Sequence, residues 1–411
     1  MKINGSEGKS VLRNILYKYV PKELIERPKA GFSIPLSDWL KGPLKDWADC
    51  LLNKERLINT FCDLVQIDSP SGEEENVALF LIDFLEKLGL KTQRDSYGNL
   101  IAKSSNNPKI ILSGHIDTVE PGRGIKPEIQ QDRIVSDGTT ILGGDAKAGV
   151  SAILEGLQSI FEEYKEIPPV EVVFTREEEI GLVGAENLDF SLISAKEAIV
   201  FDGEGPASTI TISSPTYIGF TIEVTGRSAH AGAEPEKGLS AIRIAADLIT
   251  NLPQGRLDKN TTFNIGLIEG GSTRNTVAES TTITGEFRST NIEKLDDIES
   301  EITNIVQSIK NKYPDANLAT HLHKQFETYT ISEDDPVRIR VSEALNSLGL
   351  TPDYVESGGG TYGNVFKLNN INAVVIGMAV TGMHTKREFV TIPDLVDAAH
   401  LCEALLRNEI I

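Results

Sequence analysis

The sequence is poor in cysteine, with only Cys50, Cys62 and Cys402 among 411 residues. An odd number of cysteines without metal-ligand spacing favours free thiols in a reducing compartment over a disulfide framework. No apolar run approaches the roughly 20 residues that are needed to span a bilayer. The amino terminus also lacks the basic-then-apolar layout of a signal peptide. Together these absences predict a cytoplasmic protein.

Positive charge is also scarce. Forty Lys and Arg residues stand against sixty Asp and Glu residues, which gives a formal net charge of −20. Such a surface repels nucleic acid and anionic membranes, so we expect neither as a partner. The hydrophobic fraction of 40% and the charged fraction of 24% are ordinary for a soluble globular protein. The length allows two or three domains.

The order of strand and helix patterns predicts the domain organisation. Apolar strands alternate with amphipathic helices in residues 55–212 and 328–411, which predicts an α/β domain with a mixed sheet covered by helices. Residues 213–327 between them follow the order β-α-β-β-α-β, typical of a small domain inserted as a unit. Residues 1–54 contain both tryptophans and differ from the rest, and we expect them to form an amino-terminal helical appendage.

Three adjacent glutamates, Glu177, Glu178 and Glu179, follow the apolar run "VEVVFT". Adjacent carboxylates repel one another, and local structure does not require them. Other histidines and acids also follow apolar strands, namely His115, Asp145, Asp202 and His384. Because the ends of such strands form one edge of an α/β sheet, these side chains are expected to gather there. Two histidines and several carboxylates suit a cation such as Zn²⁺, or two ions about 3.5–4 Å apart with a bridging Asp.

Each of these residues has an ordinary structural alternative. Asp145 could cap a helix, Asp202 could be a turn residue, and His384 could be a hydrogen-bonded loop histidine. His115 and Asp117 lie two residues apart, so on an extended chain they point to the same side. Asp117 can therefore hold the free ring nitrogen of a metal-bound His115.

Five motifs occur in an order that resembles a known family. "SGHIDTV", "GGDAKAG", "TREEEIG", "FDGE" and "MHTKREFV" follow one another as in the dinuclear zinc peptidases related to peptidase T, carboxypeptidase G and the aminoacylases. The resemblance covers residues 55–411 and is closest to the peptidase T-like branch. It implies a metal-dependent hydrolase of peptide bonds, an aminopeptidase acting on short peptides. An N-acyl amino-acid amidohydrolase or a carboxypeptidase, acting on the same site, is the close alternative.

The resemblance also implies roles for single residues. Glu178 matches the general base, beside the role that the spacing gives to Asp117. Two divalent metal ions are implied, zinc first, with cobalt or manganese as alternatives. By the same matching His115 and Asp202 bind one ion, Glu179 and His384 bind the other, and Asp145 bridges the two.

The inserted domain resembles the lid of that family, which also makes its dimer contact, so a homodimer is implied. His230 in "GRSAHAG" matches the lid histidine that stabilises the oxyanion; without the resemblance it would be a surface loop residue. Asn275 and Arg288 match substrate-binding positions. Gly359 and Gly360 in "ESGGGTYG" match a loop whose backbone approaches the substrate.

Residues 8–52 resemble a different family, the carboxyl-terminal stretch of glutamine-dependent asparagine synthetases. The Cys nucleophile and the Ser-Gly-Gly-x-Asp-Ser pyrophosphate loop of those enzymes are missing, so the resemblance implies no ATP or amidotransferase chemistry. The segment could be a docking element or the relic of a gene fusion. A non-catalytic binding or scaffold protein, with this segment recruiting a partner, is the alternative from another functional class.

Overall fold

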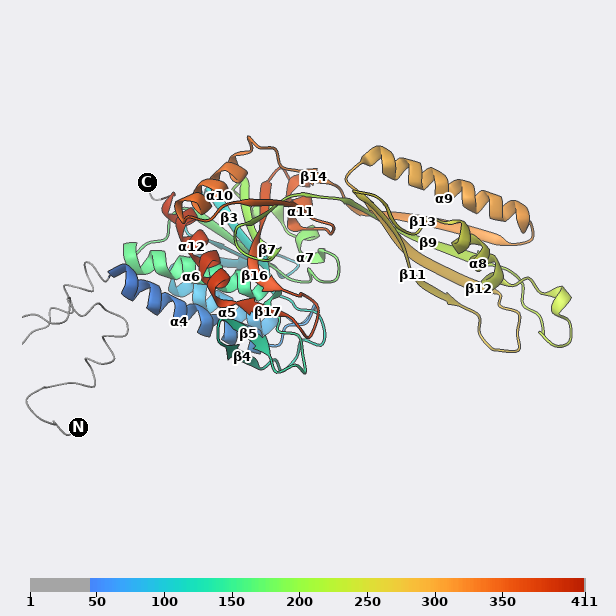
Figure 1. The fold of residues 1–411 in the computed structure, drawn as a ribbon, viewed down its shortest axis with the longest axis horizontal. Coiled ribbons are helices and arrows are strands. Elements are labelled where there is room, and N and C mark those ends of the chain that lie inside the picture. Colours follow the sequence, from blue (N-terminus) through green and yellow to red (C-terminus); the bar gives the residue numbers. More distant parts are fainter. Residues whose placement is uncertain (1–44, 410–411) are drawn as a thin grey trace, which may run out of the picture. The chain divides into compact units, whose positions relative to one another are not determined.

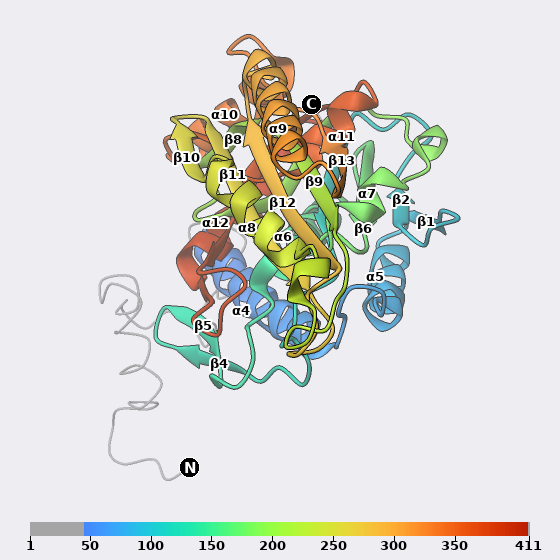
Figure 2. The same cartoon turned by 90° about the vertical axis from the view of Figure 1, so that its right-hand side faces the viewer.

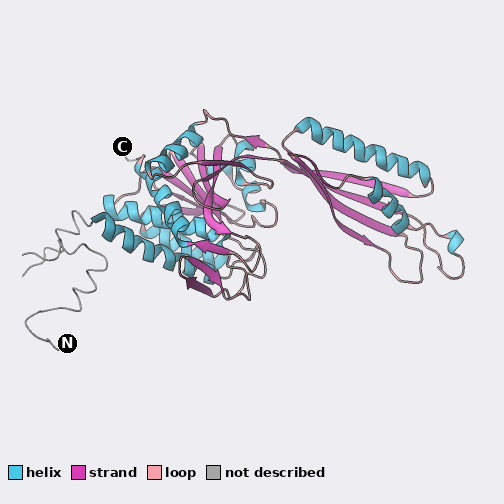
Figure 3. Ribbon diagram, in the orientation of Figure 1, coloured by secondary structure: helices cyan, strands magenta, loops and turns pink. Residues whose placement is uncertain are grey.

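The computed structural model describes residues 45–409, with side chains from residue 54 onward. The chain divides into two compact units, Met1–Leu52 and Asn53–Ile411. The second unit contains a twelve-stranded mixed sheet and a separate five-stranded sheet, both with helices packed on them (Figures 1 and 3). The expected α/β fold class is therefore confirmed.

Four parallel strands form the centre of the large sheet. They are β6 (Val170–Thr175), β3 (Ile110–His115), β7 (Glu197–Glu204) and β16 (Asn372–Thr381), in that order. Both faces of β3 and β6 are buried. This burial explains why their sequences are nearly continuous apolar runs rather than alternating ones. Because the four strands point the same way, their carboxyl ends meet at one edge of the sheet.

Shorter strands extend this sheet and make it mixed. Most pair in the antiparallel sense, whereas β15 is parallel to β8. They are β1 (Lys91–Arg94), β2 (Leu100–Lys103), β4 (Pro127–Gln130), β5 (Arg133–Ser136), β8 (Thr209–Ser214), β14 (Tyr329–Thr330), β15 (Asp353–Glu356) and β17 (Phe389–Thr391).

Helices cover both faces of the large sheet. They are α4 (Lys45–Gln66), α5 (Glu75–Lys87), α6 (Gly144–Tyr164), α7 (Val183–Glu186), α10 (Pro336–Ser347), α11 (Tyr362–Leu368) and α12 (Ile392–Arg407). Alternate residues of β6 face different layers, as the period of two in a strand requires. Val172 and Phe174 pack in a core with α5, α6 and α12, whereas Val173 packs in a second core with α7 and α11. None of the helices between residues 45 and 409 is long and apolar enough to cross a membrane.

The five-stranded sheet is antiparallel and has its own core. Its order is β10 (Gly255–Asp258), β11 (Thr261–Gly270), β12 (Ser280–Ser289), β9 (Thr216–Thr225) and β13 (Asn317–Phe326). Two helices, α8 (Ala241–Asn251) and α9 (Ile292–Lys312), pack on it (Figure 2). Alternate residues of β9 are buried from end to end, so one face of the sheet is covered. The expected order of elements is found with one addition, the short edge strand β10, whose polar sequence carries no alternating apolar signal.

Helix α4 continues through the expected boundary at residue 54. In its second half Arg56 donates hydrogen bonds to Glu155 at 2.7 and 2.8 Å and to Glu162 at 2.8 Å. Leu57 and Phe61 are buried in the core of the large domain. The segment from Arg56 onward is therefore part of the second unit. The expectation for residues 1–44, and for the tryptophan side chains, lies outside the described residues.

Candidate metal centre and active site

His115 ends β3 with both ring nitrogens engaged. Its Nδ1 lies 3.0 Å from the carbonyl oxygen of Asp117 and 3.3 Å from Asp117 Oδ1. Its Nε2 lies 3.0 Å from Asp145 Oδ1 and 3.3 Å from Asp202 Oδ1. The ring is 1% exposed. The spacing of two residues thus places Asp117 behind the ring, and the ring faces two carboxylates.

His384 faces a second pair of carboxylates. Its Nε2 lies 2.9 Å from Glu179 Oε2 and 3.2 Å from Asp145 Oδ2. The two oxygens of Asp145 therefore each face one histidine. The carboxylate of Asp145 is engaged by the two histidines, and no described backbone N–H donates a capping hydrogen bond to it. Asp202 is a residue of β7 rather than of a turn. The structure brings all five expected ligands together.

The donor set fits a pair of divalent ions. One donor atom each from His115, Asp145 and Glu179 lie within 4.8 Å of one another. Glu179 Oε1 is buried and has no hydrogen-bond partner among the described residues. An unpaired buried carboxylate oxygen is unfavourable unless a cation or a proton satisfies it. Two imidazoles and three carboxylates are ligands that zinc and related ions accept.

The acids and histidines of the cluster strongly shift one another's pKa. Burial works to raise the pKa of Asp145, but the hydrogen bonds from His115 and His384 outweigh it and hold that pKa below its usual value. Burial raises the pKa of Asp202 to about 6 and also raises the pKa of Glu179. Hydrogen bonds to Asp145 and Glu179 raise the pKa of His384 to about 10. The raised pKa of His384 favours a proton on its ring in the absence of metal, and a bound cation would replace that proton.

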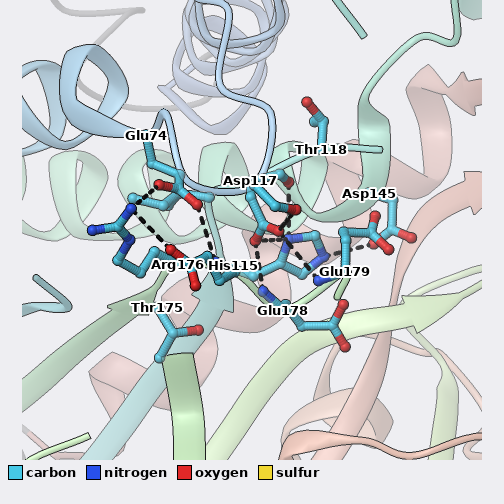
Figure 4. A network of polar contacts seen from close by, with 12 residues as sticks. Glu74, His115, Asp117, Thr118, Asp145, Thr175, Arg176, Glu178 and Glu179 are labelled. Atoms are coloured by element: carbon cyan, nitrogen blue, oxygen red, sulfur yellow. Dashed lines mark hydrogen bonds and ion pairs between the residues drawn. The ribbon is translucent and has the colours of Figure 1, made fainter. Parts of the chain in front are cut away.

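The three adjacent glutamates have three different environments. Glu177 lies 3.0 Å from the guanidinium of Arg176 and accepts a hydrogen bond from the hydroxyl of Tyr97. Glu179 faces His384. The carboxylate of Glu178 forms no hydrogen bond or ion pair with any described residue and lines a cavity. Figure 4 shows it pointing away from the surrounding network. Burial raises its pKa well above the usual value.

The cavity beside the cluster has a volume of about 410 Å³. It is bounded by Asp145, Glu178, Glu179, Asp202 and His384 on one side. The other walls come from β7, β8, β15, the loop that follows β15 and the loop that follows β16, and they include Glu204, Thr209, Thr211, Val355, Glu356, Ser357, Gly360, Thr361 and Met383. Among the described residues no Lys or Arg lines it. The cavity is therefore strongly anionic apart from the imidazole of His384.

Three of the expected substrate-binding residues lie at this cavity or beside it. Gly360 lines it, and a Cβ there would lie 2.4 Å from the ring of Phe326, so the position requires glycine. Arg288 donates a hydrogen bond of 3.2 Å to the carbonyl of Gly358. A Cβ at Gly359 would lie 3.8 Å from the guanidinium of Arg288.

The two remaining expected residues of the inserted domain, His230 and Asn275, lie close to each other. They lie at the end of the five-stranded sheet that is opposite to Arg288. Ala231 donates a hydrogen bond of 3.0 Å to the carbonyl of Asn275, which places this residue beside His230. Both lie in loops beyond the end of the β9–β12 ladder where Thr225 pairs with Ser280, whereas Arg288 lies at the other end. A strand as long as β9 spans roughly 30 Å. The structure therefore does not bring His230 and Asn275 to the cavity of their own chain.

The proton on His230 can be placed. The backbone N–H groups of Gly232 and Ala233 donate to its Nδ1 at 3.2 and 3.1 Å. Nδ1 is therefore the acceptor, and in the neutral ring Nε2 carries the proton. The exposed imidazole of His230 therefore offers Nε2 as a hydrogen-bond donor.

Comparison with known proteins identifies the family. A family model described as "Peptidase dimerisation domain" matches residues 212–314, and one described as "Asparagine synthase" matches residues 1–75. The crystal structure of aminopeptidase PepT from Bacillus cereus is 33% identical with a TM-score of 0.78, covering 87% of this chain and 99% of that one. The chain belongs to the M20 peptidase family.

Other M20 relatives agree. A tripeptidase from Staphylococcus aureus is 32% identical with a TM-score of 0.81, covering 87% of this chain and 99% of that one. Peptidase T from Listeria monocytogenes is 25% identical and covers 85% of this chain and 97% of its own length. The expected peptidase family is thus confirmed, and so is the expected class, a metal-dependent hydrolase of peptide bonds. The expected resemblance of the amino terminus to asparagine synthetases is also found.

Sequence reasoning missed two buried acids of this M20 site. Glu388 is 2% exposed and accepts the backbone N–H groups of Leu142 and Gly143 at 2.9 Å and of Asp145 at 3.2 Å. Glu74 is 3% exposed and contacts the glutamate loop. Both lie in polar stretches, "SGEEE" and "TKREF", where nothing local distinguishes a buried glutamate from a solvated one. The general rule that buried acids need partners would have singled them out, but it can be applied only once the fold shows which acids are buried.

Proposed function

We propose that this chain is a two-metal aminopeptidase that acts on short peptides. The observation that carries the proposal is the placement of Asp145, whose two carboxylate oxygens each face one histidine. His115 and Asp202 would hold one ion, Glu179 and His384 the other, with Asp145 between them. When bound, two divalent ions would supply Lewis-acid activation of water and of the scissile carbonyl. Zinc is the first candidate, and cobalt and manganese are the alternatives.

Glu178 is proposed as the general base. It is adjacent to the ligand Glu179 in the chain, its carboxylate has no partner among the described residues, and it lines the cavity. Its pKa is raised by burial, which favours accepting a proton. The same group then delivers that proton to the leaving amine. Asp117 keeps the ring of His115 in place through contacts of 3.0 and 3.3 Å to Nδ1.

The charge of the cavity favours a substrate with a free amino terminus. Two divalent ions would balance the carboxylates of Asp145, Glu178, Glu179 and Asp202. The remaining acids of the wall, Glu204 and Glu356, form no ion pair with a described residue. Their excess negative charge attracts the α-ammonium group of a peptide and gives no such attraction to an N-acyl group. This difference favours an aminopeptidase over the acylase alternative.

Arg288 could bind the other end of a short peptide. Its guanidinium lies beside Gly358 and Gly359 near the cavity, stacks 4.7 Å from the centroid of the Tyr217 ring and pairs with Glu286 at 2.9 Å. A guanidinium can grip a terminal carboxylate with two hydrogen bonds. A peptide held at both ends must be short.

The lid is proposed to act on a second copy of the chain. His230 lies at the far end of a sheet whose other end is beside the cavity, so the imidazole of one chain would complete the site of its partner in a homodimer. Residues 212–314 match a dimerisation domain, which supports this arrangement. His230 Nε2–H would then donate to the oxyanion.

Cys62 and Cys402 are free thiols, which supports a cytoplasmic location.

The test is a substrate panel measured after chelation and after return of Zn²⁺, Mn²⁺ or Co²⁺. A tripeptide is compared with its N-acetyl form, its carboxyl-terminal amide and an N-acyl amino acid. We expect chelation to abolish hydrolysis, metal to restore it, and the free tripeptide to be hydrolysed fastest. Preference for the N-acyl amino acid would instead establish the acylase alternative. A metal-loaded protein that hydrolyses none of these substrates would favour a binding protein.

A further inference from the structure

A buried carboxylate outside the metal cluster contacts the loop that carries the three glutamates. Glu74 directly precedes α5 and is separated from that loop by about a hundred residues of sequence. Its Oε1 accepts the backbone N–H of Gly72 at 2.8 Å and that of Glu177 at 3.1 Å. Its Oε2 forms an ion pair of 2.9 Å with Arg176. Figure 4 shows Glu74 and Arg176 on the opposite side of the network from the carboxylate of Glu178.

The backbone of this loop is held by side chains from elsewhere in the chain. Asn99 accepts the N–H of Arg176 at 3.2 Å, and Asp117 accepts those of Glu178 at 2.9 Å and Glu179 at 3.2 Å. Glu74 supplies the remaining contact, to the N–H of Glu177. Four successive N–H groups therefore depend on three side chains rather than on a strand or helix ladder.

Glu177 is the residue in this loop whose backbone needs support. Its φ is +52°, in the left-handed region that residues other than glycine rarely adopt. This turn lets Glu177 face Arg176 while Glu178, the next residue, faces the cavity. Removing the contact from Glu74 removes the bond to the one N–H at the turn itself.

Glu74 also controls where the local positive charge lies. Arg176 is shared between Glu74 at 2.9 Å and Glu177 at 3.0 Å, and its guanidinium lies 5.7 Å from the centroid of the Tyr97 ring. The cation is thus kept beside Glu177, and the carboxylate of Glu178 forms no ion pair with a described residue. A base paired with an arginine would be a weaker proton acceptor.

We infer that Glu74 is a positioning residue for the reaction: it fixes the turn at Glu177 and holds Arg176, so that the carboxylate of Glu178 faces the cavity unpaired. This inference rests on the proposed role of Glu178 as general base. Glu74 touches neither the cavity nor the metal ligands, and it acts through the backbone of Glu177 and through Arg176.

The experiment separates the two contacts that Glu74 makes. Both backbone bonds use Oε1, so Glu74→Gln can keep them through its amide oxygen and lose only the ion pair, whereas Glu74→Ala loses everything. Glu75→Gln is the matched control, because the side chain of Glu75 is 61% exposed and pairs with Arg94 on the surface. For each chain kcat, KM for a tripeptide, bound metal and Tm are measured on the metal-loaded full-length protein.

We expect Glu74→Ala to lower kcat by about 10–100-fold, by analogy with the loss of residues that orient metal ligands. Bound metal and KM should stay close to those of the parent, because the ligands and the cavity wall are untouched. Glu74→Gln should recover part of the lost kcat, and Glu75→Gln should equal the parent. If Glu74→Ala does not fold, Glu74→Gln decides, with a kcat reduced at parental metal content as the expected result.

Other outcomes overturn the inference in distinguishable ways. A parental kcat in both Glu74 variants, alongside an inactive Glu178→Gln, overturns the role of Glu74 and leaves the proposed base intact. A kcat that falls only as far as bound metal falls shows that Glu74 supports metal binding and not the base. An active Glu178→Gln removes the proposed base, and with it the reason for positioning it.

Discussion

At the scale of single residues, neighbours decide what a side chain does. Glu177, Glu178 and Glu179 are chemically identical and adjacent in the chain. The structure gives the first an arginine and a tyrosine, leaves the second unpaired beside the cavity, and places the third 2.9 Å from His384. Their mutual repulsion is tolerable because each charge has a different environment. These environments predict different effects of mutation.

Glu178→Ala should remove nearly all turnover while bound metal stays near the parental level, because its carboxylate holds nothing in the described structure. Glu179→Ala should lose metal as well as activity, because its carboxylate faces His384 and Asp145 within the cluster. Metal analysis and steady-state kinetics on both variants check this. Equal metal loss in the two variants would mean that the roles of base and ligand are wrongly assigned.

Metal binding should release protons. The pKa of His384 is raised to about 10 in the metal-free chain, and the carboxylates around His115 raise its pKa well above the usual value despite burial. The raised pKa values favour protonated rings in the metal-free chain, and a nitrogen must lose its proton to bind an ion. Adding Zn²⁺ to metal-free protein in weak buffer should acidify the solution, measured with a pH indicator.

The His384→Ala variant is the control for this titration. It should release fewer protons per bound ion than the parent, and metal affinity in the parent should rise with pH. Zinc binding without acidification at pH 7 would contradict the assignment of these histidines as ligands.

At the scale of elements, the five-stranded sheet separates two groups of expected substrate-binding residues. Arg288 lies at the end of β12 that pairs with the start of β9, and His230 lies beyond the other end. The β9–β12 ladder therefore places Arg288 beside the cavity of its own chain and places His230 roughly 30 Å from Arg288. If His230 has the proposed role, a complete site requires the lid of a second chain.

Mixing two inactive variants tests this requirement. His230→Ala alone should lower kcat by about 10²–10³, the usual effect of losing one oxyanion donor. In an equimolar mixture with Glu178→Gln chains, half of the dimers are mixed and one site in each has both groups, so about one quarter of the parental activity should return. The measurement is activity after subunit exchange. No recovery despite exchange, shown by native mass spectrometry, would place His230 in the site of its own chain or outside catalysis.

At the scale of the whole molecule, the amino-terminal part of this M20 peptidase chain also matches a second family model. The asparagine synthase match covers residues 1–75 and so reaches into α4 and beyond it. Yet Arg56, Leu57 and Phe61 of α4 contact the core of the peptidase domain. The second half of the helix therefore belongs to the peptidase structure, whatever the origin of its sequence.

Two truncations should behave differently. A chain that starts at Asn53 keeps Arg56, Leu57 and Phe61, and its kcat/KM should stay within about twofold of the parent because every proposed ligand lies far beyond it. A chain that starts at Asp63 loses the buried Leu57 and Phe61. Its free energy of unfolding should fall by more than the roughly 3–5 kcal/mol typical of removing one buried phenylalanine.

Kinetics, thermal melting and solution mass are compared for both truncated chains and the parent. The residues before Asn53 include both tryptophans, and their loss could change solubility or assembly without changing the chemistry. A folded, metal-loaded chain starting at Asn53 that has lost its activity would make the amino-terminal segment part of the working enzyme.

The sequence by itself indicated the central strands and the residues that we propose as metal ligands. The apolar runs of β3, β6, β7 and β16 can be recognised because a strand buried on both faces must be apolar. The proposed ligands lie at the ends of such strands or in the loops beside them. The tertiary structure decided which of three glutamates is unpaired, that Glu74 and Glu388 are buried, and that His230 is far from its own cavity. These depend on contacts between residues about a hundred or more positions apart, such as Glu74 with Glu177, and no local period of the sequence records such contacts.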